Sequence, residues 1–178
     1  MSILVGIDWS LRSPAICVWE GGDVIMSNCK FYSLGNKPQQ INSNGLDITI
    51  DKYPSYKTAY GRYQSLVNWA LDCIVVHSPL PVRDTNIVIE NYGFNANGRI
   101  TDIAESIGVL KNSLYTLGYP FHTVSVSSVK KCLTGKGNAS KDQNGELYPA
   151  PMGLKTAKSP WQDMVDAFGV LMAYQLIQ

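Results

Sequence analysis

The chain has 178 residues, of which 45% are hydrophobic and 16% charged, and its net charge is +1. This composition is typical of one globular domain that buries its core without disulfides or a structural metal, so we expect a single domain over residues 1–178. No apolar run approaches the ~20 residues of a membrane span, and residues 3–7 are too short for the apolar part of a secretion signal. The four cysteines are scattered without a CxxC pair, which argues against zinc and redox motifs and predicts a cytoplasmic protein.

The hydrophobic pattern predicts strands and helices in the order β-β-β-α-β-α-β-α. A Gly-Gly-Asp turn joins the second strand to the third. Residues 33–54 are rich in Asn, Gly, Pro and Gln and predict a long surface loop, and residues 134–160 predict a loop or a poorly ordered element. The predicted strands are 3–8, 14–19, 24–32, 86–90 and 121–126, and the predicted helices are 55–77, 99–117, a short one at 127–132, and 161 to the end.

This order predicts an α/β fold with a five-stranded mixed sheet. The first three strands are expected to be antiparallel and the later ones parallel, with helices on the faces of the sheet.

Two of the apolar strands end abruptly in an acid, Asp8 in the first and Glu90 in the fourth. The carboxyl ends of parallel strands meet at one edge of a sheet, where ligands bind, so neighbouring strands would place these carboxylates side by side. The alternative for Asp8 alone is that it caps a turn together with Ser10.

A second pair of acids, Asp163 and Asp166, begins the last predicted helix. Their spacing of three puts both side chains on one helix face, and acids in a first turn are favoured by the helix dipole. The alternative is an ordinary solvated helix face. Four carboxylates cannot all ionise close together without cations, so convergence with Asp8 and Glu90 favours a pair of Mg²⁺ or Mn²⁺ ions. Such a pair serves phosphodiester hydrolysis.

Segment 128–141 contains four lysines and no acid. This charge pattern suits contact with a phosphate backbone, although a solvated loop would also accommodate it. The lysines are Lys130, Lys131, Lys136 and Lys141.

These motifs together resemble the RuvC-type Holliday junction resolvases of the RNase H-like (retroviral-integrase) superfamily, with the phage-encoded branch nearest. The resemblance covers residues 3–174, with 33–54 outside it. It is carried by Gly6-Ile7-Asp8, Val88-Ile89-Glu90, Asp163-x-x-Asp166-Ala167, and a Lys, Gly-x-Gly, Lys pattern at Lys130, Gly135, Gly137 and Lys141.

The resemblance implies an RNase H-like fold and a Mg²⁺-dependent endodeoxyribonuclease with two ions per active site, in which Mn²⁺ would substitute. Lys130 and Lys141 would contact the scissile and neighbouring phosphates, where negative charge builds up. The implied metal ligands are Asp8, Glu90, Asp163 and Asp166.

The implied partners are four-way or branched DNA and a second copy of the chain, in a bacterial or phage-infected cell. A homodimer would place paired nicks, and helix 99–117 is the candidate dimer surface, although its apolar side chains equally suit packing on the sheet. The family places a base-probing aromatic three residues beyond its strand-end Glu, which is Gly93 here. The neighbours Tyr92 and Phe94 are the candidates, or they simply cover the sheet edge, and Arg99 is a further candidate DNA contact.

The chain departs from the family pattern directly after Asp8. Trp9-Ser10 replace a common Pro-Gly pair, and Pro14-Ala15 stand where Thr-Gly is frequent, so we expect a different turn beside the metal. The family helix within residues 142–160 is not expected at full length. His77 at a helix end is expected to be structural, and His122 to be a packed or surface residue.

Three alternative functions compete with that of a junction resolvase. An RNase H-like nuclease acting on RNA–DNA hybrids would use the same carboxylates, so only its substrate separates it from a junction resolvase. A non-catalytic branched-DNA-binding relative would be expected to lack one of the acids, and all are present. Actin-like kinases share a Gly-Ile-Asp opening but need two such domains, which 178 residues cannot supply.

Overall fold

A mixed sheet of seven strands organises the part of the chain that the structure describes. The computed structural model describes residues 2–43, 45–78, 84–91, 100–140, 143, 146–156 and 158–176. The strands are β1 (Ile3–Asp8), β2 (Ala15–Trp19), β3 (Cys29–Gly35), β4 (Gln39–Ser43), β5 (Leu46–Lys52), β6 (Thr85–Glu90) and β7 (Phe121–Val124).

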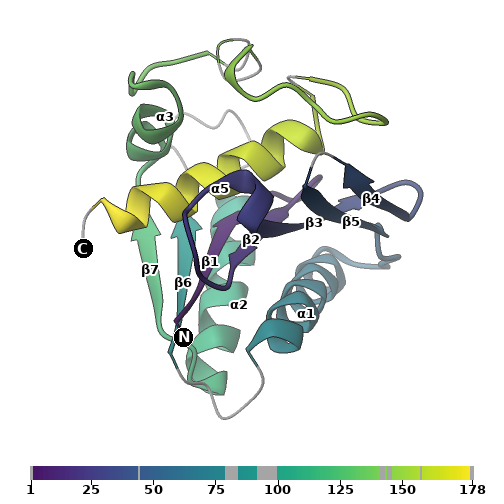
Figure 1. Cartoon of the computed structure of the whole chain (residues 1–178). Coiled ribbons are helices and arrows are strands. Elements are labelled where there is room, and N and C mark those ends of the chain that lie inside the picture. The colour runs from purple at the N-terminus through teal and green to yellow at the C-terminus, as the bar shows by residue number, and fades with distance from the viewer. Residues whose placement is uncertain are drawn as a thin grey trace.

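Helices cover both faces of this sheet (Figure 1). On one face, α5 crosses β1 and β2, and α3 packs against α5. On the other face, α1 and α2 pack together over a second core. The helices are α1 (Ala59–His77), α2 (Ile100–Leu117), α3 (Val126–Thr134) and α5 (Trp161–Gln175), and a 3₁₀ helix, η1 (Met26–Asn28), precedes β3.

The strand order is β4-β5-β3-β2-β1-β6-β7. As predicted, β1, β2 and β3 are antiparallel neighbours, and β1, β6 and β7 are parallel. The expected α/β architecture, with a mixed sheet flanked by helices, is therefore confirmed.

The predicted number of five strands is wrong, because residues 33–54 are not a loop. They hold the end of β3 and all of β4 and β5, and β5 pairs in parallel with β3. In β5, Ile48 and Ile50 are buried and alternate with the more exposed polar residues Asp47 and Thr49. The polar residues that suggested a loop therefore lie on the solvated side of a half-buried strand.

Two other predicted boundaries shift for local reasons. The third strand begins at Cys29, because residues 26–28 form the 3₁₀ helix. The helix expected from residue 55 begins at Ala59, because the Thr58 side chain caps it by accepting a hydrogen bond from the Gly61 N–H at 3.0 Å. None of the helices described here combines the length and the apolar character needed to cross a membrane.

Candidate metal centre

Asp8 and Glu90 lie at the carboxyl ends of neighbouring parallel strands. The register pairs Ile7 with Ile89, so each acid comes one residue after a paired position. Both isoleucines are fully buried in the core formed with α1 and α2. Successive strand residues face opposite sides of a sheet, so both acids face the side that α5 covers.

Helix α5 approaches β1 closely because residue 6 is glycine. A Cβ at Gly6 would lie 2.3 Å from the Ala167 carbonyl oxygen and 3.0 Å from the Leu171 nitrogen. Only glycine therefore permits this contact. The contact holds the first turns of α5, which carry Asp163 and Asp166, over the end of β1.

The result is a cluster of three carboxylates, Asp8, Asp163 and Asp166. One potential ligand atom from each lies within 4.8 Å of the others. Glu90 lies at the adjacent strand end but is not part of this cluster. The structure thus brings three of the four predicted acids together.

Asp163 has the strongest requirement for a positive partner. Its residue is only 6% exposed, and its Oδ2 atom is buried with no hydrogen-bond donor among the described residues. A buried carboxylate oxygen without a partner is unfavourable, and a divalent cation would satisfy it together with the two neighbouring acids. The donor set therefore fits Mg²⁺ or Mn²⁺.

Gln162 orients one of the three acids, a role that the sequence did not reveal. Its Nε2 donates to Asp166 Oδ1 at 3.1 Å, and the residue is 1% exposed. Such contacts fix the rotamer of a metal-binding carboxylate. In the sequence, the only sign of this role was that Gln162 is a polar residue next to Asp163. The fold was needed to show that Gln162 is buried.

A cleft of about 400 Å³ has Asp163 among its lining residues. Its walls come from the β1–β2 turn, the start of α2 and the segment before α5. Arg12 is exposed and lines this cleft together with Asp163. The sequence analysis gave Arg12 no role, because a single turn arginine carries no pattern of its own.

The residues that replace the family Pro-Gly pair have clear structural roles. Trp9 is buried, and its Nε1 donates to the buried Ser106 hydroxyl of α2 at 3.0 Å. Ser10 Oγ accepts a hydrogen bond from the Ser13 N–H at 2.9 Å and so closes the turn. The β1–β2 turn is thereby anchored to the opposite helical layer.

The lysine-bearing helix α3 begins at the same sheet edge as the acids. The register pairs Glu90 with Val124, and α3 starts two residues later, with Ser125 rather than the predicted Ser127-Ser128 as its cap. It packs on α5 at Gly169, where an added Cβ would lie 2.7 Å from Leu133.

The predicted DNA-contacting residues are described only in part. Lys130 is half-buried on α3, and Lys131 and Lys136 are exposed. Gly135 ends the helix in the left-handed conformation, with φ of 77°. The candidates Lys141, Tyr92, Phe94 and Arg99 lie outside the described residues.

His77 has the structural role predicted for it. Its Nε2 lies 2.6 Å from the Tyr32 hydroxyl and its Nδ1 lies 2.8 Å from Glu20 Oε1. Burial raises the pKa of Tyr32 to about 12. The hydrogen bond to His77, reinforced by Lys30, lowers the pKa of Glu20. His122 is exposed, with its ring centroid 4.8 Å from that of Tyr174.

Comparison with known proteins identifies the fold. No family model matches the chain, and no curated protein matches it in sequence. A structure of Thermus thermophilus RuvC is 18% identical, with a TM-score of 0.59 over 97% of this chain and 93% of that one. The structure of T. thermophilus RuvC in complex with a Holliday junction substrate is 17% identical, with a TM-score of 0.62 over 99% and 94%. The chain has a RuvC-like fold, as the sequence motifs predicted.

Proposed function

We propose that this protein is a metal-dependent endonuclease that resolves Holliday junctions and other branched DNA. One observation carries the proposal: a potential ligand atom from each of Asp8, Asp163 and Asp166 lies within 4.8 Å of the others in a RuvC-like fold. Among the described residues, none donates a hydrogen bond to the buried Asp163 Oδ2. The RuvC structure bound to a Holliday junction supports this choice of substrate. We also propose that residues 1–178 form a single catalytic domain. The protein would belong to the phage-encoded branch and act in a bacterial or phage-infected cell.

The acids would hold two divalent ions. Asp8, Asp163 and Asp166 form the cluster, and Glu90 would complete the set from the neighbouring strand. When bound, the ions would supply an attacking hydroxide and stabilise the leaving oxygen of the scissile phosphodiester. Gln162 would hold Asp166 in the ligating orientation, and Gly6 would hold α5 at the required distance from Asp8.

The positive residues would bind phosphate groups around the cut. Lys130 and Lys141 would contact the scissile and adjacent phosphates, and Lys131 and Lys136 would neutralise the backbone nearby. Tyr92, Phe94 and Arg99 would contact the junction. The exposed positions of Lys131 and Lys136 support this assignment.

A homodimer would provide two active sites and so allow paired cuts. Helix α2 buries Ile107, Leu110 and Leu114 in the core. It also leaves Tyr115 78% exposed. Large aromatic side chains are enriched at protein interfaces, so this exposed residue supports α2 as the dimer surface.

Cleavage assays on three substrates test the function. Purified protein would be incubated with a synthetic four-way junction, a linear duplex and an RNA–DNA hybrid, with and without Mg²⁺ or Mn²⁺. We expect paired nicks in the junction only when metal is present. Metal-independent cutting would contradict the proposal, preference for the hybrid would favour an RNase H-like activity, and binding without cutting would indicate a non-catalytic junction-binding protein.

A further inference from the structure

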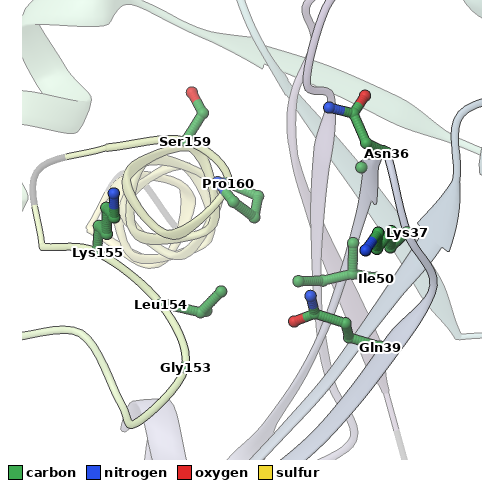
Figure 2. A pocket seen from close by; sticks show the side chains of 10 residues that line it. Asn36, Lys37, Gln39, Ile50, Gly153, Leu154, Lys155, Ser159 and Pro160 are labelled. Atoms are coloured by element: carbon green, nitrogen blue, oxygen red, sulfur yellow. The ribbon is translucent and has the colours of Figure 1, made fainter.

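A second cleft, of about 330 Å³, lies between the sheet and the segment that leads into α5. Figure 2 shows its two walls, one from the sheet and one from the segment that leads into α5. The sheet wall carries Asn36, Lys37 and Gln39, and the other wall carries Leu154, Lys155 and Ser159.

The cleft has an apolar floor and a polar, positively charged rim. Ile50, which is 4% exposed, and Leu154 face each other across it (Figure 2). Lys37 and Lys155 are both exposed, and no acid is among the lining residues. Within the described part of the chain, neither lysine forms a salt bridge. Their charges are therefore available to an external anion.

This cleft shares one lining residue, Ser159, with the cleft at Asp163. At the junction between them, Ser13 Oγ donates to Ser159 Oγ at 3.3 Å. Pro160 follows, and Asp163 lies three residues further along α5. A strand leaving the acids would thus pass Arg12 and Ser159 and then meet Lys155 and Lys37.

The sheet wall comes from the segment outside the family resemblance. Lys37 lies between β3 and β4, and Gln39 begins β4. β4 and β5 therefore each contribute a residue, Gln39 and Ile50, to this cleft.

We propose that this lysine cleft, defined by Lys37 and Lys155, binds the phosphate backbone of the DNA strand on one side of the cut. The inference rests on the proposed function and adds the path of one DNA arm. Lysines without acidic partners attract phosphates and release their counterions, and amide and hydroxyl groups can donate to phosphate oxygens. Such contacts position the strand without reading its sequence.

Substitutions of the two lysines test the inference through the salt dependence of binding. Lys37→Gln, Lys155→Gln and the double variant would be compared with wild type by fluorescence anisotropy on a four-way junction, without divalent metal and over a series of salt concentrations. Each phosphate contact contributes about 0.9 to the slope of log K against log salt. We expect the slope to fall by about 1 in each single variant and by about 2 in the double variant.

Lys30→Gln is the matched control. Lys30 lies near the start of β3, at the opposite end from the cleft, and its side chain is 41% exposed beside Glu20. The Lys30→Gln substitution removes the same charge as the cleft substitutions and should leave the slope of log K against log salt unchanged. Lys155→Arg keeps the charge and should also retain the wild-type slope, which separates phosphate binding from a folding defect.

The two proposals fail in different ways. Wild-type slopes in all cleft variants, alongside wild-type junction cleavage, would overturn the lysine cleft and leave the nuclease function intact. An equal fall in slope for Lys30→Gln would also overturn it, since the effect would be one of net charge. Failure of the wild-type protein to bind or cut the junction would overturn the proposed function itself.

Discussion

The acidic cluster and the lysine cleft are built differently, although Ser159 lines both the lysine cleft and the cleft at Asp163. The acids are fixed by packing: Gly6 sets the distance between β1 and α5, and Asp163 and Gln162 are buried. The cleft instead presents exposed lysines on an apolar floor. Buried groups define the geometry of the site and tolerate few substitutions. Each exposed charge instead contributes a small increment to the affinity for DNA.

The largest effect is expected from Asp163→Asn. The substitution removes the charge of the buried Asp163 carboxylate at nearly constant volume, so cleavage should fall by about 10²–10³-fold or more. Junction binding should be retained, as measured by gel shift. Addition of Mn²⁺ should raise the melting temperature of the wild type but not of the variant, because only the wild type retains the full ligand set. Loss of junction binding by a folded variant would count against the assigned role.

Gly6→Ala should come next, acting on geometry instead of charge. A Cβ placed 2.3 Å from the Ala167 oxygen forces α5 away from β1, which should destabilise the protein by about 1–3 kcal/mol and reduce cleavage. Gly108→Ala is the control, because that exposed helical glycine has nothing within 4 Å of an added Cβ. It should stabilise α2 by up to about 1 kcal/mol. Equal melting temperatures for the two variants would contradict the close approach.

Gln162→Leu should give an intermediate effect at the same centre. Loss of the donor to Asp166 removes its orientation, and we expect a 10–100-fold decrease in metal affinity or activity. The measurement is the Mg²⁺ concentration for half-maximal cleavage, with Gln162→Asn as the variant that keeps the amide. An unchanged metal requirement would show that the hydrogen bond is dispensable.

The smallest effect is expected far from both regions, at Glu20. Its pKa is lowered mainly by the hydrogen bond to His77, with a contribution from Lys30. The stabilisation is therefore present above the ordinary carboxyl pKa and is lost as the pH falls through the lowered folded value. Glu20→Gln should lower the melting temperature at pH 7 by no more than about 2 °C, and by less at acid pH. Asp23→Asn is the control for the loss of one exposed carboxylate.

Three of the four acids singled out in the sequence come together in the structure, and their signals were local. An apolar strand that ends in a carboxylate is visible in the chain, and Asp163 and Asp166 share a helix face by spacing alone. The convergence of Asp8 with Asp163 and Asp166 depends on the packing of α5 against β1. The parallel pairing of β1 with β6, which the element order already favoured, places Glu90 at the adjacent strand end. In the sequence, Gly6 is part of the Gly6-Ile7-Asp8 motif. Its close contact with α5 is visible only in the folded structure.

The lysine cleft could not be predicted in the same way. Lys37 and Lys155 lie far apart in the sequence, and only the fold places the turn between β3 and β4 opposite the segment before α5. The polar outer face of β4 and β5 also hid these strands, because buried residues such as Ile48 and Ile50 were too few to outweigh the Asn and Gly content. Arg12 was missed for a related reason. A single arginine in a turn has no recognisable sequence pattern, and only the structure shows that it lines the same cleft as Asp163.

The most direct test of the central claim is the position of Mn²⁺ in crystals of the protein bound to a four-way junction, located by its anomalous scattering. Crystals of Asp163→Asn with the same junction would show whether ion binding depends on that carboxylate. We predict peaks coordinated by Asp8, Asp163 and Asp166 in the wild type, and a weakened or missing peak in the variant. Mn²⁺ bound elsewhere, with no peak at the three carboxylates, would contradict the assignment of this cluster as the metal centre.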